Sequence, residues 1–249
     1  MTALQRFKSY MWPDTLTEVH KLLECKNPAQ GLRLPVLRTV SVLIFAGILF
    51  HSYFALEGYR LNYLIAFTQW GIFITAFTFI VLLACVFINR GSSFGKFINR
   101  LGYVFFEISW TAEVVITIVF WAILVVVDFE KAHDFDWEVL AFLGETHLIP
   151  ITLLALEFTS NKVRFTKSHA IFAAIPPTLY TGVSIFFSLV YDIHVYPILT
   201  WKDYKSAIFG LIITALFAAG FFSGYHIGEY KTRRRERRHR TAALLIVNE

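Results

Sequence analysis

The stretch Tyr63–Ile88, with the sequence YLIAFTQWGIFITAFTFIVLLACVFI, places 26 residues in a row without a charged side chain. A helix needs about 20 apolar residues to cross the ~30 Å hydrocarbon core of a bilayer. The whole chain of 249 residues is 56% hydrophobic and only 16% charged. Soluble globular domains carry about 25% charged residues. The composition therefore excludes a soluble or disordered protein and predicts an integral membrane protein.

Other apolar stretches of similar length lie on both sides of this one, and together they predict an all-α, polytopic bundle of six transmembrane helices. In chain order the expected spans are Val36–Leu56, Tyr63–Ile88, Tyr103–Val127, Trp137–Thr159, His169–Tyr191 and Ser206–Tyr225. The short connections favour one transmembrane domain over residues 36–230, preceded by a segment 1–35 and followed by a tail 231–249. Pro176 and Pro177 are expected to kink the fifth span, because proline removes a backbone hydrogen bond.

The distribution of basic residues predicts the orientation. Nineteen of the 23 Lys and Arg residues lie in the amino-terminal segment, in the loops after the second and fourth spans, and in the tail. By the positive-inside rule both termini face the cytoplasm or the mitochondrial matrix. An even number of spans requires the same arrangement. The membrane itself, an endomembrane or the mitochondrial inner membrane, is left open.

The two ends of the chain are expected to contact membranes or partners. Pro13–Glu24 reads as a short amphipathic helix on the membrane surface, with an apolar stripe of Leu16, Val19, Leu22 and Leu23. The tail KTRRRERRHR is polybasic and predicts binding to anionic lipid or to an acidic membrane-protein partner. It accounts for the net charge of +5 without nucleic acid. Its basic residues are Lys231, Arg233, Arg234, Arg235, Arg237, Arg238 and Arg240.

Polar side chains inside the spans are functional candidates, because they are costly in hydrocarbon. Thr68 lies five residues into the second span and His147 ten residues into the fourth. At 1.5 Å per residue their depths are roughly 8 and 15 Å, so the two side chains meet if the helices are neighbours. A hydroxyl beside an imidazole is the smallest nucleophile and base pair. The alternative is a hydrogen bond that only packs two helices together.

A carboxylate is expected to orient the imidazole, as in hydrolase triads, and Glu113 or Glu145 could supply it. The other polar residues within the spans are His51, Gln69, Glu107, Glu157 and His226. Two cysteines far apart in the chain form no zinc or disulfide pattern. No metal or other cofactor is therefore expected. The glycines Gly220, Gly224 and Gly228 form a ladder that lets helices approach closely.

Three short segments resemble the androgen-induced (FAR-17a-like) and rolling-stone-like membrane proteins. They are the start of the second span at Tyr63–Gly71, the fourth span from Thr146 through Pro150 to Glu157, and the loop Asp192–Leu199 with its Val-Tyr-Pro sequence. The order and the six-span layout match over Val36–Tyr230. His147 stands closer to the proline than the family histidine does, which is expected to rotate its imidazole around the helix.

The resemblance implies a threonine hydrolase of fatty-acid esters, with Thr68 as the nucleophile and His147 as the second essential residue. A second function of a different class stays open. The chain is then a non-catalytic accessory subunit of a large membrane complex, such as a respiratory-chain assembly, and uses the six-helix fold to bind lipid and partner helices. The polybasic tail and its apolar end, with Leu244, Leu245 and Ile246, favour this second function.

Overall fold

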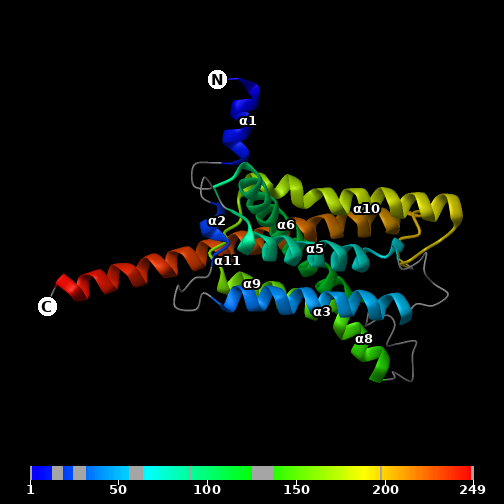
Figure 1. Ribbon diagram of the computed structural model, residues 1–249. Helices are drawn as coiled ribbons and strands as arrows, with labels where there is room; N and C mark the ends of the chain where they lie inside the picture. Colours follow the sequence, from blue (N-terminus) through cyan, green and yellow to red (C-terminus); the bar gives the residue numbers. More distant parts are fainter. Residues whose placement is uncertain are drawn as a thin grey trace.

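The computed structural model is built of helices and contains six that are long and apolar enough to cross a membrane (Figure 1). It describes residues 2–12, 19–24, 32–55, 64–89, 91–124, 137–196 and 198–247. The predicted all-α bundle is confirmed. Its long helices are α3 (Arg33–Ala55), α5 (Phe67–Phe87), α6 (Ser93–Val119), α8 (Trp137–His147) with α9 (Ile149–Ser160), α10 (Ala170–Tyr191) and α11 (Tyr204–Val247).

Helix α6 occupies the centre of the bundle and packs against α5, α9, α10 and α11. It begins ten residues before the predicted third span, because Ser92 caps it by accepting a hydrogen bond from the Gly95 N–H at 2.9 Å. At its other end it continues into η3 (Phe120–Leu124), a turn of π-helix. Such segments often lie at functional sites.

The predicted fourth span is two helices. Helix α8 ends at His147, and α9 starts at Ile149 with Pro150 in its first turn, where a missing N–H costs nothing. Helix α10, in contrast, runs through Pro176 and Pro177 without ending. The chain therefore breaks beside His147, and not at the proline pair of the fifth span.

The glycine ladder of α11 lets this helix approach its neighbours closely. A side chain at Gly224 would come within 2.4 Å of the Phe165 ring, and one at Gly228 within 2.8 Å of the Arg164 backbone. Both residues precede η4 (Lys167–His169). The structural role predicted for the ladder is confirmed.

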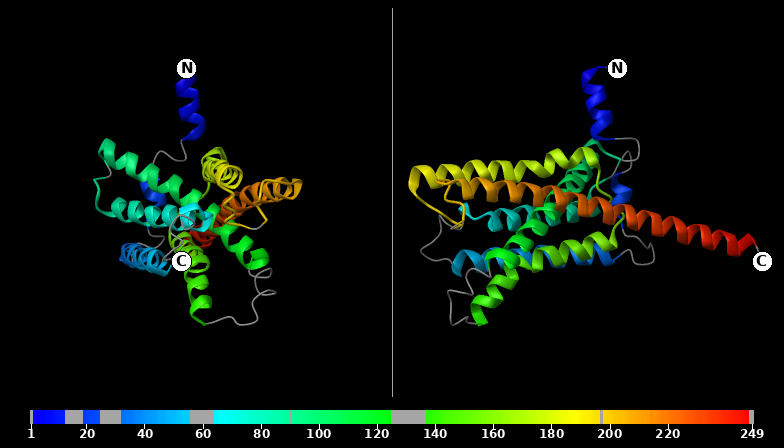
Figure 2. Two further views of the ribbon diagram at one scale, coloured as in Figure 1. Left: turned by 90° about the vertical axis from the view of Figure 1, so that its right-hand side faces the viewer. Right: turned by 180° about the vertical axis from the view of Figure 1, so that it is seen from behind.

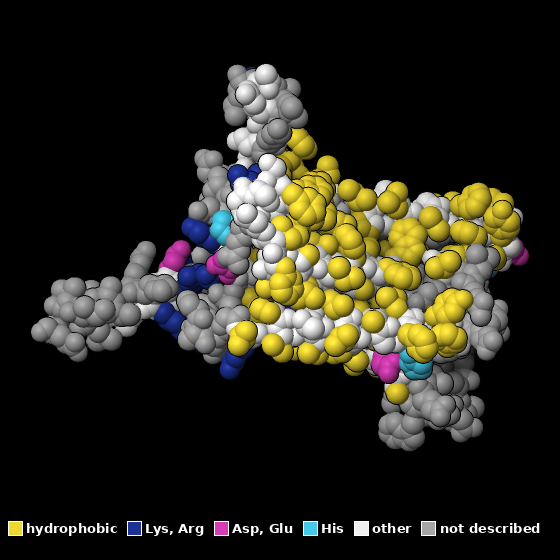
Figure 3. Space-filling model, viewed as in Figure 1, with side chains coloured by type: hydrophobic (Ala, Val, Ile, Leu, Met, Phe, Trp, Pro, Cys, Tyr) yellow, Lys and Arg dark blue, Asp and Glu magenta, His cyan; other side chains and the backbone are white. Residues whose placement is uncertain are grey.

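Both ends of the chain lie at the same end of the bundle, where the Lys and Arg side chains gather (Figures 1 and 3). Helix α1 (Ala3–Met11) points away from the bundle, and α11 extends far beyond it (Figure 2). Residues 13–18 of the predicted amphipathic helix lie outside the described residues. Its described part, α2 (Val19–Leu22), packs against α6, with Val19 and Leu23 in the core. Val19 and Leu23 of the predicted apolar stripe therefore pack on the bundle, and contact of the helix with the membrane surface stays a prediction.

Two buried polar pairs tie the helices together at this basic end, and the first is the ion pair between Arg38 and Glu157. The Arg38 guanidinium donates to Glu157 at 2.6 Å and to the carbonyls of Leu23 and Leu82. His169 bonds Glu107 at 2.6 Å and lies 2.8 Å from the Met11 carbonyl. Every one of these ionisable groups has several partners, which is the condition for burying them in a membrane protein.

Candidate functional site

Thr68 and His147, which the sequence singled out, meet in the structure. Thr68 lies in the first turn of α5 and His147 is the last residue of α8. The Thr68 Oγ1 and His147 Nε2 atoms are 3.3 Å apart, within hydrogen-bond distance. The break between α8 and α9 allows this contact despite the short spacing between His147 and Pro150. The geometric part of the prediction is confirmed, and its catalytic part stays a prediction.

The partners of the second ring nitrogen fix the tautomer of His147. Its Nδ1 lies 3.0 Å from the Leu143 carbonyl oxygen, which can only accept, so Nδ1 carries the hydrogen. The Thr146 hydroxyl, 2.8 Å from Nδ1, donates its own hydrogen to the Phe142 carbonyl and accepts from the imidazole. Nε2 is therefore left with its lone pair facing the Thr68 hydroxyl. This is the arrangement that a general base requires.

Neighbouring side chains also hold the plane of the imidazole. The Phe120 ring, in the first residue of η3, stacks on it with 3.5 Å between centroids and an interplanar angle of 14°. Thr117 donates to the His147 carbonyl at 2.9 Å. His147 is only 7% exposed. The ring is thus fixed at its face and at its Nδ1 edge, and Nε2 has one direction in which to act.

The prediction that Glu113 or Glu145 orients the His147 imidazole is wrong. Glu113 accepts a hydrogen bond from Thr75 at 2.8 Å, and Glu145 pairs with His51 at 2.7 Å. Glu145 lies two residues before His147, and side chains at that spacing do not share a helix face. A backbone carbonyl of the same helix turn takes the position that a carboxylate has in a triad.

Tyr196, in the loop between α10 and α11, completes the group around Thr68. Its hydroxyl accepts from the Phe67 N–H at 3.2 Å, which places it next to the Thr68 side chain. Burial raises the pKa of Tyr196, which therefore stays a neutral phenol beside Thr68. The sequence analysis gave Tyr196 no role. The one signal for it was the Val-Tyr-Pro sequence of the resemblance.

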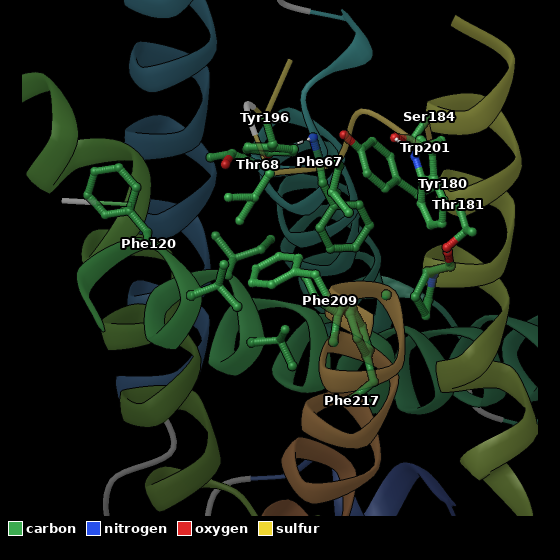
Figure 4. Close-up of a pocket in the computed structure, with 18 residues that line it drawn as sticks. Phe67, Thr68, Phe120, Tyr180, Thr181, Ser184, Tyr196, Trp201, Phe209 and Phe217 are labelled. Atoms are coloured by element: carbon green, nitrogen blue, oxygen red, sulfur yellow. Dashed lines mark hydrogen bonds between the residues drawn. The ribbon is translucent and has the colours of Figure 1, made fainter. Parts of the chain in front are cut away.

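Thr68 lies in the wall of an apolar cavity that is partly open to the outside. Thr68, Tyr196 and Phe120 lie on one side, and Tyr180, Thr181, Ser184 and Trp201 lie on the other (Figure 4). Phe209 and Phe217 of α11 close a further wall (Figure 4). Such a cavity, apolar with a few polar groups at one place, is typical of a ligand site.

Trp201 anchors the loop that covers this cavity. Its backbone has a positive φ of 55°, and its N–H and indole Nε1 donate to Ser206 and Ser184, each at 2.9 Å. A Cβ at Gly210 would lie 3.2 Å from the Trp201 ring, so glycine leaves room for the indole against α11. The same loop carries Tyr196, and its anchoring therefore also positions the Tyr196 hydroxyl.

The predicted binding residues of the tail fall into two groups. Lys231 turns back to the bundle, where its ammonium donates to the carbonyls of Phe158 and Val163 and stands 3.9 Å from the Phe158 ring centroid. The described arginine side chains that follow are exposed: Arg233, Arg234, Arg235, Arg237 and Arg238. The side chains of Arg240 and of Leu244, Leu245 and Ile246 lie outside the described part.

Among the described residues, no three His, Cys, Asp or Glu side chains lie close enough together to hold a metal ion. Comparison of the chain with protein-family models, curated proteins and solved structures gave no match. The chemistry of the site therefore has to be argued from its own residues.

Proposed function

We propose that this integral membrane protein hydrolyses lipid esters, with Thr68 as the nucleophile and His147 as the general base. The observation that carries the proposal is the 3.3 Å contact between Thr68 Oγ1 and His147 Nε2 at the wall of an apolar cavity. A threonine hydroxyl is a weak nucleophile and needs a base within hydrogen-bond reach. The tautomer of His147 supplies that base.

The reaction follows from these positions. As Thr68 Oγ1 attacks the ester carbonyl carbon, His147 Nε2 takes the hydroxyl proton, and the tetrahedral intermediate carries a negative oxygen. The imidazolium returns the proton to the leaving alcohol, and an acyl-Thr68 ester remains. Water then attacks this ester while His147 takes a proton from the water. As the second intermediate collapses and releases the fatty acid, the imidazolium returns its proton to Thr68 Oγ1, which restores the hydroxyl and the neutral His147.

The Tyr196 hydroxyl is the candidate donor to the negative oxygen. When Thr68 Oγ1 attacks the ester carbonyl, the neutral Tyr196 phenol beside it can donate to the developing charge. The Phe67 N–H, which it accepts from, keeps the phenol beside Thr68. Donors placed before the reaction, in a site closed to water, provide large rate enhancements.

The apolar lining of the cavity favours the binding of an acyl chain next to the ester group. Fatty-acid esters are also the substrates that the sequence resemblance implies, although no family model matches the chain.

The test is hydrolysis of p-nitrophenyl palmitate by the full chain in lipid nanodiscs. Thr68→Ala and His147→Ala should each lower kcat by about a thousandfold or more, and the double variant should lose no more than either single one. Thr152→Ala and His226→Ala, which change an exposed threonine and an exposed histidine, serve as matched controls and should keep full activity. Activity that survives both site substitutions would refute the proposal.

The second candidate function is that of an accessory subunit in a membrane assembly. It is favoured by α11, which continues beyond the bundle and presents five exposed arginines to anionic lipid or an acidic partner (Figures 1 and 2). Mild-detergent purification tests it. A protein that comes only within a larger complex, and separates from it when residues 233–249 are deleted, supports the subunit function.

A further inference from the structure

A second apolar space lies beside the cavity at Thr68, between α10 and α11. This space is also partly open to the outside. Four residues line both spaces: Pro177, Thr181, Ile213 and Phe217. The cavity and this groove are therefore separated only by side chains that they share.

The groove opens on the surface that faces the hydrocarbon. Its lining residues Ala174, Thr178, Ala218 and Phe222 are exposed, and all of them lie within candidate membrane spans. The surface of the bundle between its two ends is covered with hydrophobic side chains (Figure 3). What meets the groove from outside is thus a lipid chain and not water.

The groove has no free hydrogen-bond donor among its described threonines. Thr178, Thr181 and Thr214 each donate to the carbonyl four residues earlier in their own helix, at 2.8, 2.8 and 2.9 Å. Their methyl groups are left to face the groove together with alanine, isoleucine, phenylalanine and proline side chains. This lining suits a hydrocarbon chain and gives a polar headgroup nothing to bind.

The cavity, in contrast, contains a polar group that is poorly paired. The Tyr180 hydroxyl makes no hydrogen bond of ordinary distance and angle among the described residues, with the Tyr196 hydroxyl as its polar neighbour, and Tyr180 is only 7% exposed. A buried, poorly paired hydroxyl costs free energy, which a polar group of a bound ligand would recover. The cavity therefore offers a polar group near Thr68, and the groove beside it offers an apolar surface that reaches the bilayer.

We propose that the groove between α10 and α11 holds the acyl chain of a membrane lipid ester, and that the substrate reaches Thr68 from the bilayer through it. This inference rests on the proposed hydrolase function. The two spaces together follow α10 from Ser184 to Ala170, a length of about 20 Å. That length accommodates a long acyl chain and sets the preference of the site for long over short chains.

The first experiment compares two neighbouring alanines of α11. Ala218 lines the groove, whereas Ala219 does not, and both are exposed. Ala218→Phe should lower kcat/KM for p-nitrophenyl palmitate by about tenfold, the loss expected when about two buried methylene groups are displaced. Hydrolysis of p-nitrophenyl butyrate should not change. Ala219→Phe should resemble the wild type with both esters.

The second experiment does not need hydrolysis. A palmitic acid that carries a diazirine near its terminal methyl is photolysed with the protein in nanodiscs, and the labelled peptides are mapped. Labelling in α10 and α11 around Ala174 and Ala218 is expected in the wild type and in Thr68→Ala, and Ala218→Phe should reduce it while Ala219→Phe does not.

These readouts separate the two proposals. If neither the wild type nor any variant hydrolyses either ester, but the groove is labelled as described, the hydrolase function is refuted and the acyl-chain site is supported. The groove proposal is overturned if Ala218→Phe and Ala219→Phe change the hydrolysis of the palmitate and butyrate esters equally. It is also overturned if the two variants are labelled to the same extent around Ala174 and Ala218.

Discussion

The two ends of the bundle bury polar groups in opposite ways. At the basic end Arg38, Glu157, Glu107 and His169 are charged or chargeable, at most 2% exposed, and bonded to several partners each. Around Thr68 the groups are neutral, border a cavity, and include the poorly paired Tyr180 hydroxyl. This difference indicates different roles. Ionisable groups whose hydrogen bonds are all satisfied hold helices together, whereas incompletely paired neutral groups that border a cavity are free to bind and react.

The comparison also explains why the charged end offers no second active site. The Glu157 carboxylate receives two nitrogens of Arg38 and the amide of Asn161, which leaves no oxygen to act on a substrate. Glu107 is occupied in the same way by His169 and the Thr166 N–H. Intramembrane charge is a default indicator of function, but here its partners indicate a clamp between helices.

The largest expected effect is on stability and comes from breaking this clamp. Glu157→Leu leaves the Arg38 guanidinium buried without a counter-charge, which should reduce the free energy of unfolding by about 3–5 kcal/mol. The measurement is chemical unfolding in detergent micelles followed by tryptophan fluorescence. Thr68→Ala, at the other site, should leave the unfolding transition within about 1 kcal/mol of the wild type.

Two controls sharpen this comparison. Glu145→Leu removes an ion pair with His51 that is partly exposed, and should cost under about 1 kcal/mol. The double variant Arg38→Leu/Glu157→Leu should recover part of the lost stability, because it removes both buried charges. If Glu157→Leu is as stable as Glu145→Leu, the basic end is not a clamp.

The next largest effect is expected at Tyr196. Tyr196→Phe removes the proposed donor to the negative oxygen and should lower kcat by about a hundredfold, with a smaller change in KM. The Phe67 N–H loses its acceptor, and the cost in stability should be only about 1 kcal/mol. Steady-state hydrolysis of p-nitrophenyl palmitate measures this. A change in KM alone would mean that Tyr196 shapes the cavity and does not act on the reacting atoms.

Thr146 is expected to have a smaller, positioning effect. Thr146→Val removes the hydroxyl that accepts from His147 Nδ1, while the Leu143 carbonyl still holds the ring. Losing one of two such bonds should lower kcat by about fivefold without a change in KM. Thr146→Ser, which keeps the hydroxyl, should restore the rate. If serine fails to restore it, the loss arises from packing around the ring.

The sequence predicted the helices well within the membrane-spanning segments, where the thickness of the bilayer sets their length. It predicted the helix ends outside the membrane less well. The six spans follow from apolar runs, whose lengths match the bilayer. Hydropathy does not show that α6 starts at Ser93, because its first turns contain Lys96, Asn99 and Arg100 and the start depends on the Ser92 cap. The same is true of α11, whose basic residues are good helix formers and continue the helix to Val247.

At the candidate site the depth of two side chains could be predicted, but their surroundings could not. Counting residues placed Thr68 and His147 at depths of roughly 8 and 15 Å, near enough to meet between neighbouring helices, and the structure joins them. The acceptor that fixes the imidazole is a backbone carbonyl, a group that every residue carries, so no sequence pattern indicates it. Tyr196 reaches Thr68 only because its loop folds back over the start of α5, which depends on the anchoring of Trp201 by Ser184 and Ser206.

The smallest expected effect concerns the outer face of that loop, where Asp192 ends α10 and contacts both Lys202 and His194. The hydrogen bond from Lys202 is the main cause that lowers the pKa of Asp192 below its ordinary value of 3.8. A lowered pKa means that the contact stabilises the fold above that ordinary value and is lost as the pH falls through the lowered one. Lys202→Ala should therefore reduce the unfolding temperature slightly at neutral pH, and the difference from the wild type should close on acidification below 3.8. Because Asp192 is fully solvated, salt should also reduce the difference. Thermal unfolding over a pH series, at low and high salt, measures both trends.

A difference in unfolding temperature that neither acid nor salt affects would show that Lys202 acts through packing. A large loss of ester hydrolysis in the same variant would show that this exposed contact, and not only Trp201, holds the loop with Tyr196 over the cavity.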